Sequence, residues 1–148
     1  MMAIRTIEEE LSDLKKANKH GSFVYASSSE TFSSVCNNHF RHIKKIDKHG
    51  VYIIRQKSTN QVLYIGKGGT INDQGVFKRQ DIPGRLTNRK GKISSNEWFK
   101  TLLSEKGVLV IEYLFLNKIP MSPAFVESVL LQSYLNEYGQ LPNRNNEL

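Results

Sequence analysis

The sequence predicts an α/β protein of the α+β type, with a small, three-stranded, largely antiparallel sheet flanked by helices. Apolar runs at 51–54 and 62–65 flank a polar turn, a pattern typical of a β-hairpin. An almost unbroken apolar run at 108–116 indicates a third strand, covered on both faces. Apolar residues at three- and four-residue spacing predict helices around 4–19, 96–105 and 124–138.

Length and charge limit the class of protein. The chain has 148 residues, which suffices for one domain with a single core, and a net charge of +7. Such an excess of cations favours a polyanionic partner, nucleic acid before an acidic membrane surface. Its one cysteine, Cys36, excludes an intrachain disulfide and suits a reducing compartment. Without a transmembrane or signal-peptide pattern, we expect a cytoplasmic protein that does not enter a membrane.

The first 47 residues are expected to begin with a helix. Thr6 is a suitable cap, three glutamates follow it, and three lysines lie toward the other end, as the helix dipole favours. Ile4, Ile7, Leu11 and Leu14 give this helix one apolar stripe. We expect it to end at residues 20–21, and to serve mainly for packing.

The stretch from 22 to 42 is harder to interpret. Residues 23–25 are compatible with a short strand, and the serines at 27–29 with a helix start before Phe32. Cys36, His39 and His42 follow at three-residue spacing, which on a helix would allow a zinc site. Structural zinc usually takes four ligands, and the neighbouring cations oppose a metal. Histidines that contact phosphate, or are simply exposed, are the preferred interpretation.

The hairpin carries a family signature. Gly50-Val51-Tyr52, a short spacer and Tyr64-Ile65-Gly66 resemble the defining motif of the GIY-YIG nucleases. The alternation of side chains along strands lets such a hairpin bring the two tyrosine hydroxyls close together. The resemblance runs from about residue 50 to 145. It implies a nuclease-like domain over 48–148, with an insertion at about 70–83, and an N-terminal extension over 1–47 in the same compact unit.

A glycine-rich loop, Lys67-Gly68-Gly69-Thr70, follows the second strand. The order of its residues is not that of a Walker A phosphate loop, so we expect no nucleotide cofactor. The glycines instead allow a sharp turn or a close approach of the backbone to a phosphate. Lys67 is placed to contact that phosphate, and a plain exposed lysine is the alternative.

The arginine that the resemblance implies is Arg85, because it follows a helix-start pattern at Pro83-Gly84. Arg79 is its rival, although the proline at 83 would break a helix that follows it. Many relatives place a histidine or tyrosine one turn after this arginine, whereas this chain has Arg89. This chain therefore lacks any role that the histidine or tyrosine has in the relatives, but Arg89 offers a second cation that can bind phosphate.

Cations are concentrated after the hairpin. Residues 78–106 contain eight Lys and Arg against three acids, a concentration suited to tracking phosphates. A solvated basic helix face is the alternative. The candidate nucleic-acid contacts are Lys67, Arg79, Arg85, Arg89, Lys90 and Lys92.

The last long helix carries one carboxylate in an otherwise uncharged stretch, Glu127. Pro120 marks the break before the helix, Ser122 is the expected cap and Pro123 the first helical residue. The position of Glu127 in the order of elements matches the metal-binding glutamate of the family. At the end of the chain the resemblance implies Asn145 as the closing asparagine, with Asn143 as second choice.

Together these residues predict a metal-dependent endonuclease that hydrolyses DNA phosphodiester bonds, as a monomer or homodimer. Glu127 would hold one Mg²⁺ or Mn²⁺ ion, and Arg85 would bind phosphate oxygens. Tyr52 or Tyr64 would act as base or position the water. The resemblance implies Tyr52, and the residues themselves leave the choice open. The expected catalytic set is Tyr52, Tyr64, Lys67, Arg85, Glu127 and Asn145.

Three alternatives share parts of this prediction. The first is a nucleic-acid-binding module of the same fold with weak or no catalysis. The second is a nuclease directed at RNA. The third, a scaffold that binds no nucleic acid, agrees least with the charge.

Overall fold

The computed structural model describes residues 5–116 and 121–145. Two residues with an expected role lie outside these ranges. Ile4 was expected in the apolar stripe of the first helix, and Pro120 as the break before the last helix. In chain order the described elements are α1 (Ile7–Ala17), β1 (Lys19–Tyr25), α2 (Phe32–Arg41), β2 (Gly50–Gln56), β3 (Val62–Gly68), β4 (Thr70–Ile71), β5 (Phe77–Lys78), α3 (Ile82–Leu86), α4 (Ser95–Lys106), β6 (Leu109–Phe115) and α5 (Pro123–Tyr138).

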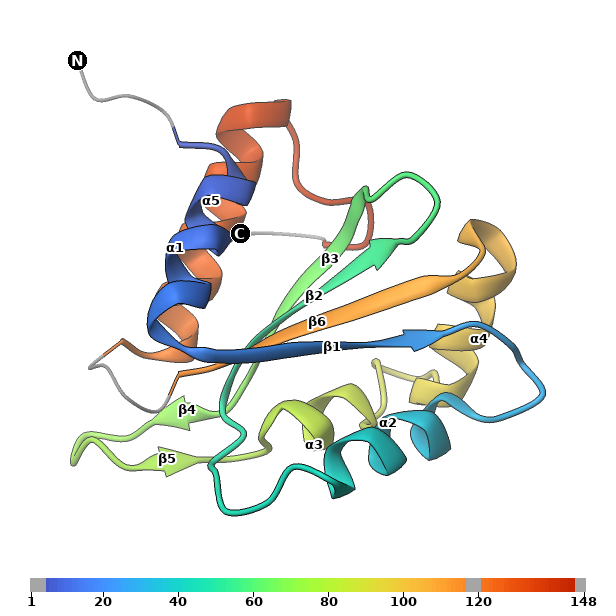
Figure 1. Cartoon of the computed structure of the whole chain (residues 1–148), viewed down its shortest axis with the longest axis horizontal. Helices are drawn as coiled ribbons and strands as arrows, with labels where there is room; N and C mark the ends of the chain where they lie inside the picture. Colours follow the sequence, from blue (N-terminus) through green and yellow to red (C-terminus); the bar gives the residue numbers. More distant parts are fainter. Residues whose placement is uncertain (1–4, 117–120, 146–148) are drawn as a thin grey trace.

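The main sheet is antiparallel and has the strand order β1-β6-β2-β3. Helices α1 and α5 cover one face, and α2, α3 and α4 cover the other (Figure 1). Two cores result, because alternate residues of each strand point to opposite faces. Val51 and Ile53 of β2 enter the core under α1 and α5, whereas Tyr52 and Ile54 enter the core under the other three helices.

The expected three-stranded sheet is wrong by one strand. The hairpin β2–β3 and its neighbour β6 are as predicted, but β1 adds a fourth strand by pairing with β6 from Lys19↔Phe115 to Tyr25↔Leu109. The N-terminal helix, which was expected to end at residues 20–21, ends earlier, at Ala17. The first half of β1 is largely exposed, so it carries no apolar pattern, and its pairing with a distant strand determines its conformation.

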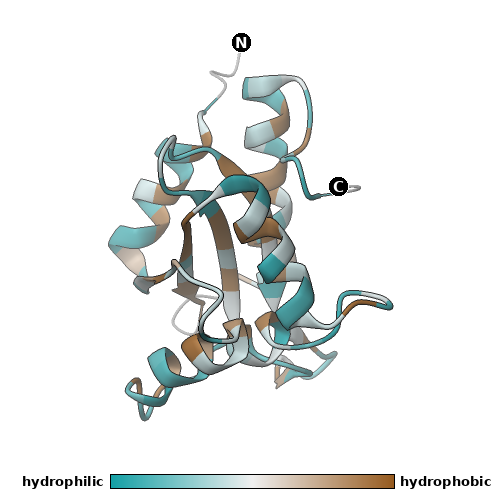
Figure 2. Cartoon of the chain, turned by 90° about the vertical axis from the view of Figure 1, so that its right-hand side faces the viewer, coloured by the Kyte–Doolittle hydropathy of each residue, from teal (hydrophilic) through white to brown (hydrophobic). Residues whose placement is uncertain are grey.

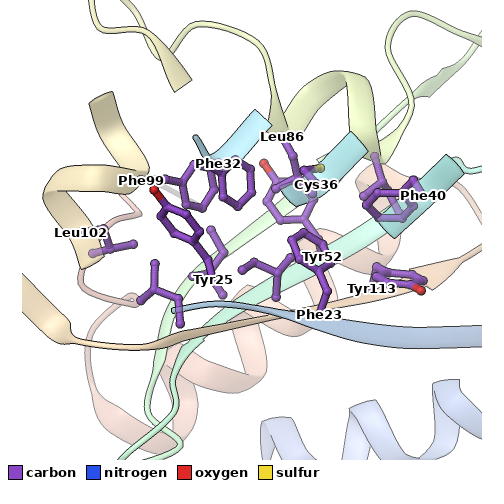
Figure 3. Close-up of a cluster of buried hydrophobic side chains, with 14 of the residues drawn as sticks. Phe23, Tyr25, Phe32, Cys36, Phe40, Tyr52, Leu86, Phe99, Leu102 and Tyr113 are labelled. Carbon is purple, nitrogen blue, oxygen red and sulfur yellow. The ribbon is translucent and has the colours of Figure 1, made fainter. Parts of the chain in front are cut away.

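Helix α2 begins at Phe32 with Thr31 as its cap, and not at the preceding serines. Its Cys36 is fully buried in an aromatic cluster with Phe32, Phe40 and Tyr113 (Figure 3). His39 packs on this cluster, and its Nε2 lies 2.7 Å from the Tyr113 hydroxyl. No group of three His, Cys, Asp or Glu residues suited to a metal occurs among the described residues, so the zinc alternative gains no support.

The N-terminal extension shares its cores with the rest of the chain. Helix α1 starts with the expected cap at Thr6, as a full capping box, and packs Ile7 and Leu11 against α5 and the sheet.

Figure 2 shows hydrophobic residues gathered along the strands, with hydrophilic ones along much of the surrounding helices and loops. Among the described helices, none has the length and apolar character needed to cross a membrane.

The predicted insertion contains a second, two-stranded sheet. Strands β4 and β5 pair as Thr70↔Lys78 and Ile71↔Phe77, and the β-hairpin that they form over residues 70–78 is called the β4–β5 ribbon, or the ribbon, below. The five-residue helix α3 follows, capped by the Asp81 side chain, with Pro83 in its first turn. The ribbon projects away from the main sheet, below the lower end of α5 (Figure 1).

Candidate active site

A polar cleft of about 570 Å³ lies where the end of β3, the ribbon, α3 and α5 meet. Five of the ten site residues predicted from the sequence lie on its walls, although they come from positions 64 to 127 of the chain. Its lining residues are Tyr64, Lys67, Gly69, Thr70, Arg79, Gln80, Arg85, Asn88 and Glu127.

The hairpin places the two tyrosines side by side. Tyr52 lies opposite Gly66, and Tyr64 lies opposite Ile54, so both rings point to the same face of the sheet. The ring centroids are 5.9 Å apart and the planes are inclined by 26°. A Cβ at position 66 would overlap both rings. Glycine is therefore required there, which explains the final glycine of the motif in steric terms.

The two phenols differ in their access to the cleft. Tyr64 is half-buried and lines the cleft, whereas Tyr52 is 1% exposed and lies behind it. The hydroxyl of Tyr52 is buried without a hydrogen-bond partner among the described residues. A substrate in the cleft therefore meets Tyr64 first, and Tyr52 can act only over a distance or through a bound water.

Burial raises the pKa of both phenols. It raises the pKa of Tyr52 well above the ordinary value of 10, and the nearby Tyr64 raises it further, while Arg85 acts in the opposite direction. Burial also raises the pKa of Tyr64, which Glu127 reinforces and Arg85 opposes. At neutral pH both hydroxyls are therefore donors as well as acceptors.

Helix α5 delivers the carboxylate. Ser122 caps the helix and Pro123 begins it, as the sequence predicted. One turn later Glu127 is half-buried at the wall of the cleft. Burial raises the pKa of Glu127 above its ordinary value, while the charges of Lys67 and Arg85 lower it. Within the described ranges, no cation lies within 4.0 Å of this carboxylate, so its oxygens are available to a ligand.

Both rival arginines line the cleft. Arg85 is exposed on α3, whose first turn is fixed by the bond from the Gly84 N–H to the Asp81 side chain (3.0 Å). Its charge acts on the pKa of both tyrosines and of Glu127. Arg79 approaches from the ribbon with φ of 66°. Arg85, and not Arg79, is therefore the arginine whose charge acts on the phenols and the carboxylate.

Other predicted residues do not line the cleft. Asn145 forms two hydrogen bonds with the backbone of Ile65, each of 2.9 Å, and so fixes the strand that carries Tyr64. Its rival Asn143 is exposed in the turn before it. Arg89 donates to the Lys92 carbonyl, and Lys90 donates to the Arg85 carbonyl while lying over the Trp98 ring. Burial lowers the pKa of Lys90 to about 8.

Sequence reasoning missed two cleft residues, Gln80 and Asn88, which hydrogen-bond to each other through their side chains at 2.9 Å. Asn88 follows Arg85 by three residues, a spacing that places two side chains on one face of a helical turn, and this was an available signal. Nothing local in the sequence indicates that Gln80 lies at the cleft, because the path of the ribbon brings it there.

The residues of the cleft fit one divalent ion of the Mg²⁺ type. Mg²⁺ binds through one or two carboxylates, retains several waters and takes further oxygens from substrate phosphates. Glu127 supplies one carboxylate. It is the one acidic residue among the described residues that line the cleft, so the protein offers an anchor that a bound phosphate would complete, and not a closed cage of protein ligands.

Comparison of this chain with models of known protein families, with curated proteins and with solved structures finds no match. The resemblance to the GIY-YIG nucleases therefore remains a prediction from the motif residues.

Proposed function

We propose that this chain is a metal-dependent endonuclease that hydrolyses phosphodiester bonds of DNA. The observation that carries the proposal is the cleft itself. It joins one carboxylate without an ion pair among the described residues, three cationic side chains and a phenol, drawn from four separate segments. A set of this kind matches the needs of phosphodiester hydrolysis, which are stabilisation of phosphate charge, an anchored Lewis acid and an oriented water.

Arg85 would bind the scissile phosphate. A guanidinium presents a rigid fork of N–H donors to two oxygens of a phosphate, and its interaction strengthens as negative charge develops on them. Lys67, half-buried at the end of β3, would bring a second positive charge to the same phosphate. These two side chains are also the cations that lower the pKa of Glu127, so all three groups are electrostatically close.

Tyr64 would orient the attacking water through its hydroxyl, because it is the phenol on the wall of the cleft. Its raised pKa makes it a poor base in the protein alone, and the charge of Arg85 changes that pKa in the favourable direction. Glu127 would hold the divalent ion. When bound, Mg²⁺ or Mn²⁺ supplies Lewis-acid stabilisation of charge on the phosphoryl and leaving oxygens.

The test is cleavage of supercoiled plasmid with Mg²⁺ and with EDTA, for the wild type and for Glu127→Gln. We expect nicking by the wild type with Mg²⁺ only. Loss of the anchoring charge should reduce the rate in the variant by about 10³-fold or more, with plasmid binding retained. Glu30→Gln is the matched control, because Glu30 is exposed in the loop before α2. A Glu127→Gln protein that cleaves at the wild-type rate would refute the mechanism.

A binding module without catalysis is the second candidate, and one observation favours it. Burial raises the pKa of both phenols further above neutral pH, so neither is a ready base. The same plasmid assay separates the two candidates. A binder would retard the plasmid in a gel at every Mg²⁺ concentration and would never convert it to the nicked form.

A further inference from the structure

The β4–β5 ribbon forms one side of the cleft and projects beyond it. Thr70 at the start of β4 and Arg79 after β5 both line the cleft. The ribbon then runs outward from the sheet below the end of α5 (Figure 1). A polymer whose phosphate lies in the cleft would therefore lie beside the root of this ribbon.

The ribbon is held at its root. Phe77 of β5 stacks on His49, with ring centroids 4.7 Å apart and planes inclined by 10°. Gly69 lies against the same histidine so closely that a Cβ there would overlap the imidazole ring, and its φ of 99° also requires glycine. Because Phe77 of β5 and Gly69, just before β4, both lie against one ring, the root of the ribbon packs on the body of the protein.

The tip is also preorganised. The Asn72 side chain accepts hydrogen bonds from the backbone N–H groups of Gln74 and Val76, at 3.0 and 2.9 Å. Backbone bonds join Asn72 to Val76 and Gly75. A tip closed in this way loses little conformational freedom when it binds, which is the usual advantage of a rigid recognition element.

The chemistry of the ribbon changes along its length. Lys78 and Arg79, at the root, are exposed cations beside the cleft, whereas the tip exposes Asp73, Gln74 and Val76, the last 52% exposed. A carboxylate and an apolar side chain suit base edges better than phosphates. Glutamine can pair with adenine, aspartate can accept from the cytosine amino group, and an apolar side chain can contact the thymine methyl group.

The dimensions of the ribbon suit the major groove. A two-stranded ribbon fits the major groove of B-form DNA, which is about 12 Å wide and about 8.5 Å deep. Three to four residues separate Thr70 from the tip, so the ribbon reaches on the order of 10 Å beyond the cleft. That reach covers the depth of the major groove. In A-form RNA the major groove is too narrow for side chains to read.

We propose that the β4–β5 ribbon enters the major groove beside the phosphate held in the cleft, and so makes this chain selective for B-form duplex DNA. Arg79 binds the backbone at the groove edge, while Gln74 and Val76 contact base pairs. This inference rests on the proposed function for the position of the phosphate. It adds the class of substrate, duplex DNA over duplex RNA or single strands, and the residues that select it.

The experiment measures binding in EDTA, so that it does not depend on cleavage. Fluorescence anisotropy would give dissociation constants for a 20-base-pair DNA duplex, an RNA duplex of the same sequence and one DNA strand. Two variants are compared with the wild type. In the first, Asn-Gly replaces residues 72–76, which closes the ribbon with a two-residue turn and keeps Phe77. In the second, Gln74→Ala and Val76→Ser change exposed side chains only.

We expect the shortened ribbon to weaken binding of the DNA duplex at least tenfold, and binding of the RNA duplex or single strand less than threefold. The double variant should lose about threefold for DNA duplex alone. Ser58→Ala, in the exposed turn of the other hairpin, is the control and should change nothing. If the shortened protein does not fold, as circular dichroism would show, the double variant decides the question.

Wild-type protein that binds both duplexes equally, or both ribbon variants within twofold of the wild type for duplex DNA, would overturn the inference. The two proposals fail separately. Ribbon-dependent binding by a protein that never nicks plasmid would refute only the nuclease. Mg²⁺-dependent nicking with ribbon-independent binding would refute only the role of the ribbon.

Discussion

Two glutamates, Glu112 on β6 and Glu127 on α5, each lie partly buried near two cations, yet their surroundings act on them in opposite ways. Glu112 forms ion pairs with Arg55 and Lys15, and its pKa is lowered although burial opposes this. Glu127 has Lys67 and Arg85 nearby without forming an ion pair to either, and its pKa is raised by burial. The first carboxylate has its partners in the protein, whereas the second lacks them.

The difference distinguishes a carboxylate that stabilises the fold, Glu112, from one that is available to a ligand, Glu127. The guanidinium of Arg55 is 5% exposed and bonds to Glu112, to Glu8 of α1 and to the Asn60 carbonyl, so this network ties α1 to the sheet. A buried charge with several partners stabilises the fold only as long as all of them remain. At the cleft the charges are held apart by the backbone, which leaves them available for an anion and a cation from outside.

The largest effect on stability is expected from Glu112→Gln. It leaves the buried guanidinium of Arg55 without its nearest carboxylate, and the free energy of unfolding should fall by about 3 kcal/mol. For a chain of this size the melting temperature should fall by roughly 6–12 °C. Urea denaturation would measure the change. Glu127→Gln is the counterpart and should leave stability unchanged or slightly raised. Equal losses in both variants would end the distinction between the two carboxylates.

The two arginines give a second matched pair. Arg85→Lys should reduce plasmid cleavage about 30-fold, roughly 2 kcal/mol, because lysine lacks the fork that binds two phosphate oxygens. Its stability should not change, since Arg85 is exposed. Arg55→Lys should do the reverse and destabilise the protein with little effect on the cleavage rate of the folded fraction. A stability loss in Arg85→Lys would show that the Arg85 guanidinium stabilises the fold, and would contradict its role in binding phosphate.

Local patterns in the sequence predicted the elements whose signals lie within the element. The hairpin, α4, β6 and α5 with its Ser122 cap follow from apolar spacing and capping residues. The family resemblance, and not these patterns, predicted that Tyr64, Lys67, Arg85 and Glu127 belong to one site, and all four line the cleft. Strand β1 was not predicted as a full strand, because its pairing with β6 and not its own composition determines it.

Burial and hydrogen-bond partners were beyond reach of the sequence. The residues themselves leave the choice between Tyr52 and Tyr64 open, but the layer of helices α2 to α4 covers Tyr52 and leaves Tyr64 at the cleft. Likewise Asn145 matches a functional position, yet its amide is used on the backbone of Ile65. Both outcomes depend on contacts between segments far apart in the chain, for which spacing carries no information.

Acid titration distinguishes the two glutamates without changing a cation. The pKa of Glu112 is lower in the folded than in the unfolded chain, so its contribution to stability is present above the unfolded value of 4.5 and is lost as pH falls through the folded value. The pKa of Glu127 is raised by folding, so its contribution is present below 4.5 and is lost as pH rises through the folded value.

Stability measured between pH 3 and 7 should therefore fall less on acidification in Glu112→Gln than in the wild type, and more in Glu127→Gln. Urea midpoints at each pH would show this. Cleavage should have an acid limb, since Glu127 must be ionised to hold a cation. A limb that persists in Glu127→Gln at reduced rate would assign the titration to another group.

The smallest effects are expected at the two phenols, and they extend the comparison from carboxylates to tyrosines. Tyr52→Phe removes a hydroxyl that is buried without a partner among the described residues, so the free energy of unfolding should change by less than about 1 kcal/mol, and in the stabilising direction. Tyr64→Phe removes a hydroxyl from the wall of the cleft, where it should cost cleavage about tenfold and stability nothing measurable. If Tyr52→Phe instead stops cleavage while the protein remains folded, the buried phenol must reach the substrate through water or a movement of the cleft wall. The base implied by the family resemblance would then be favoured over the exposed tyrosine.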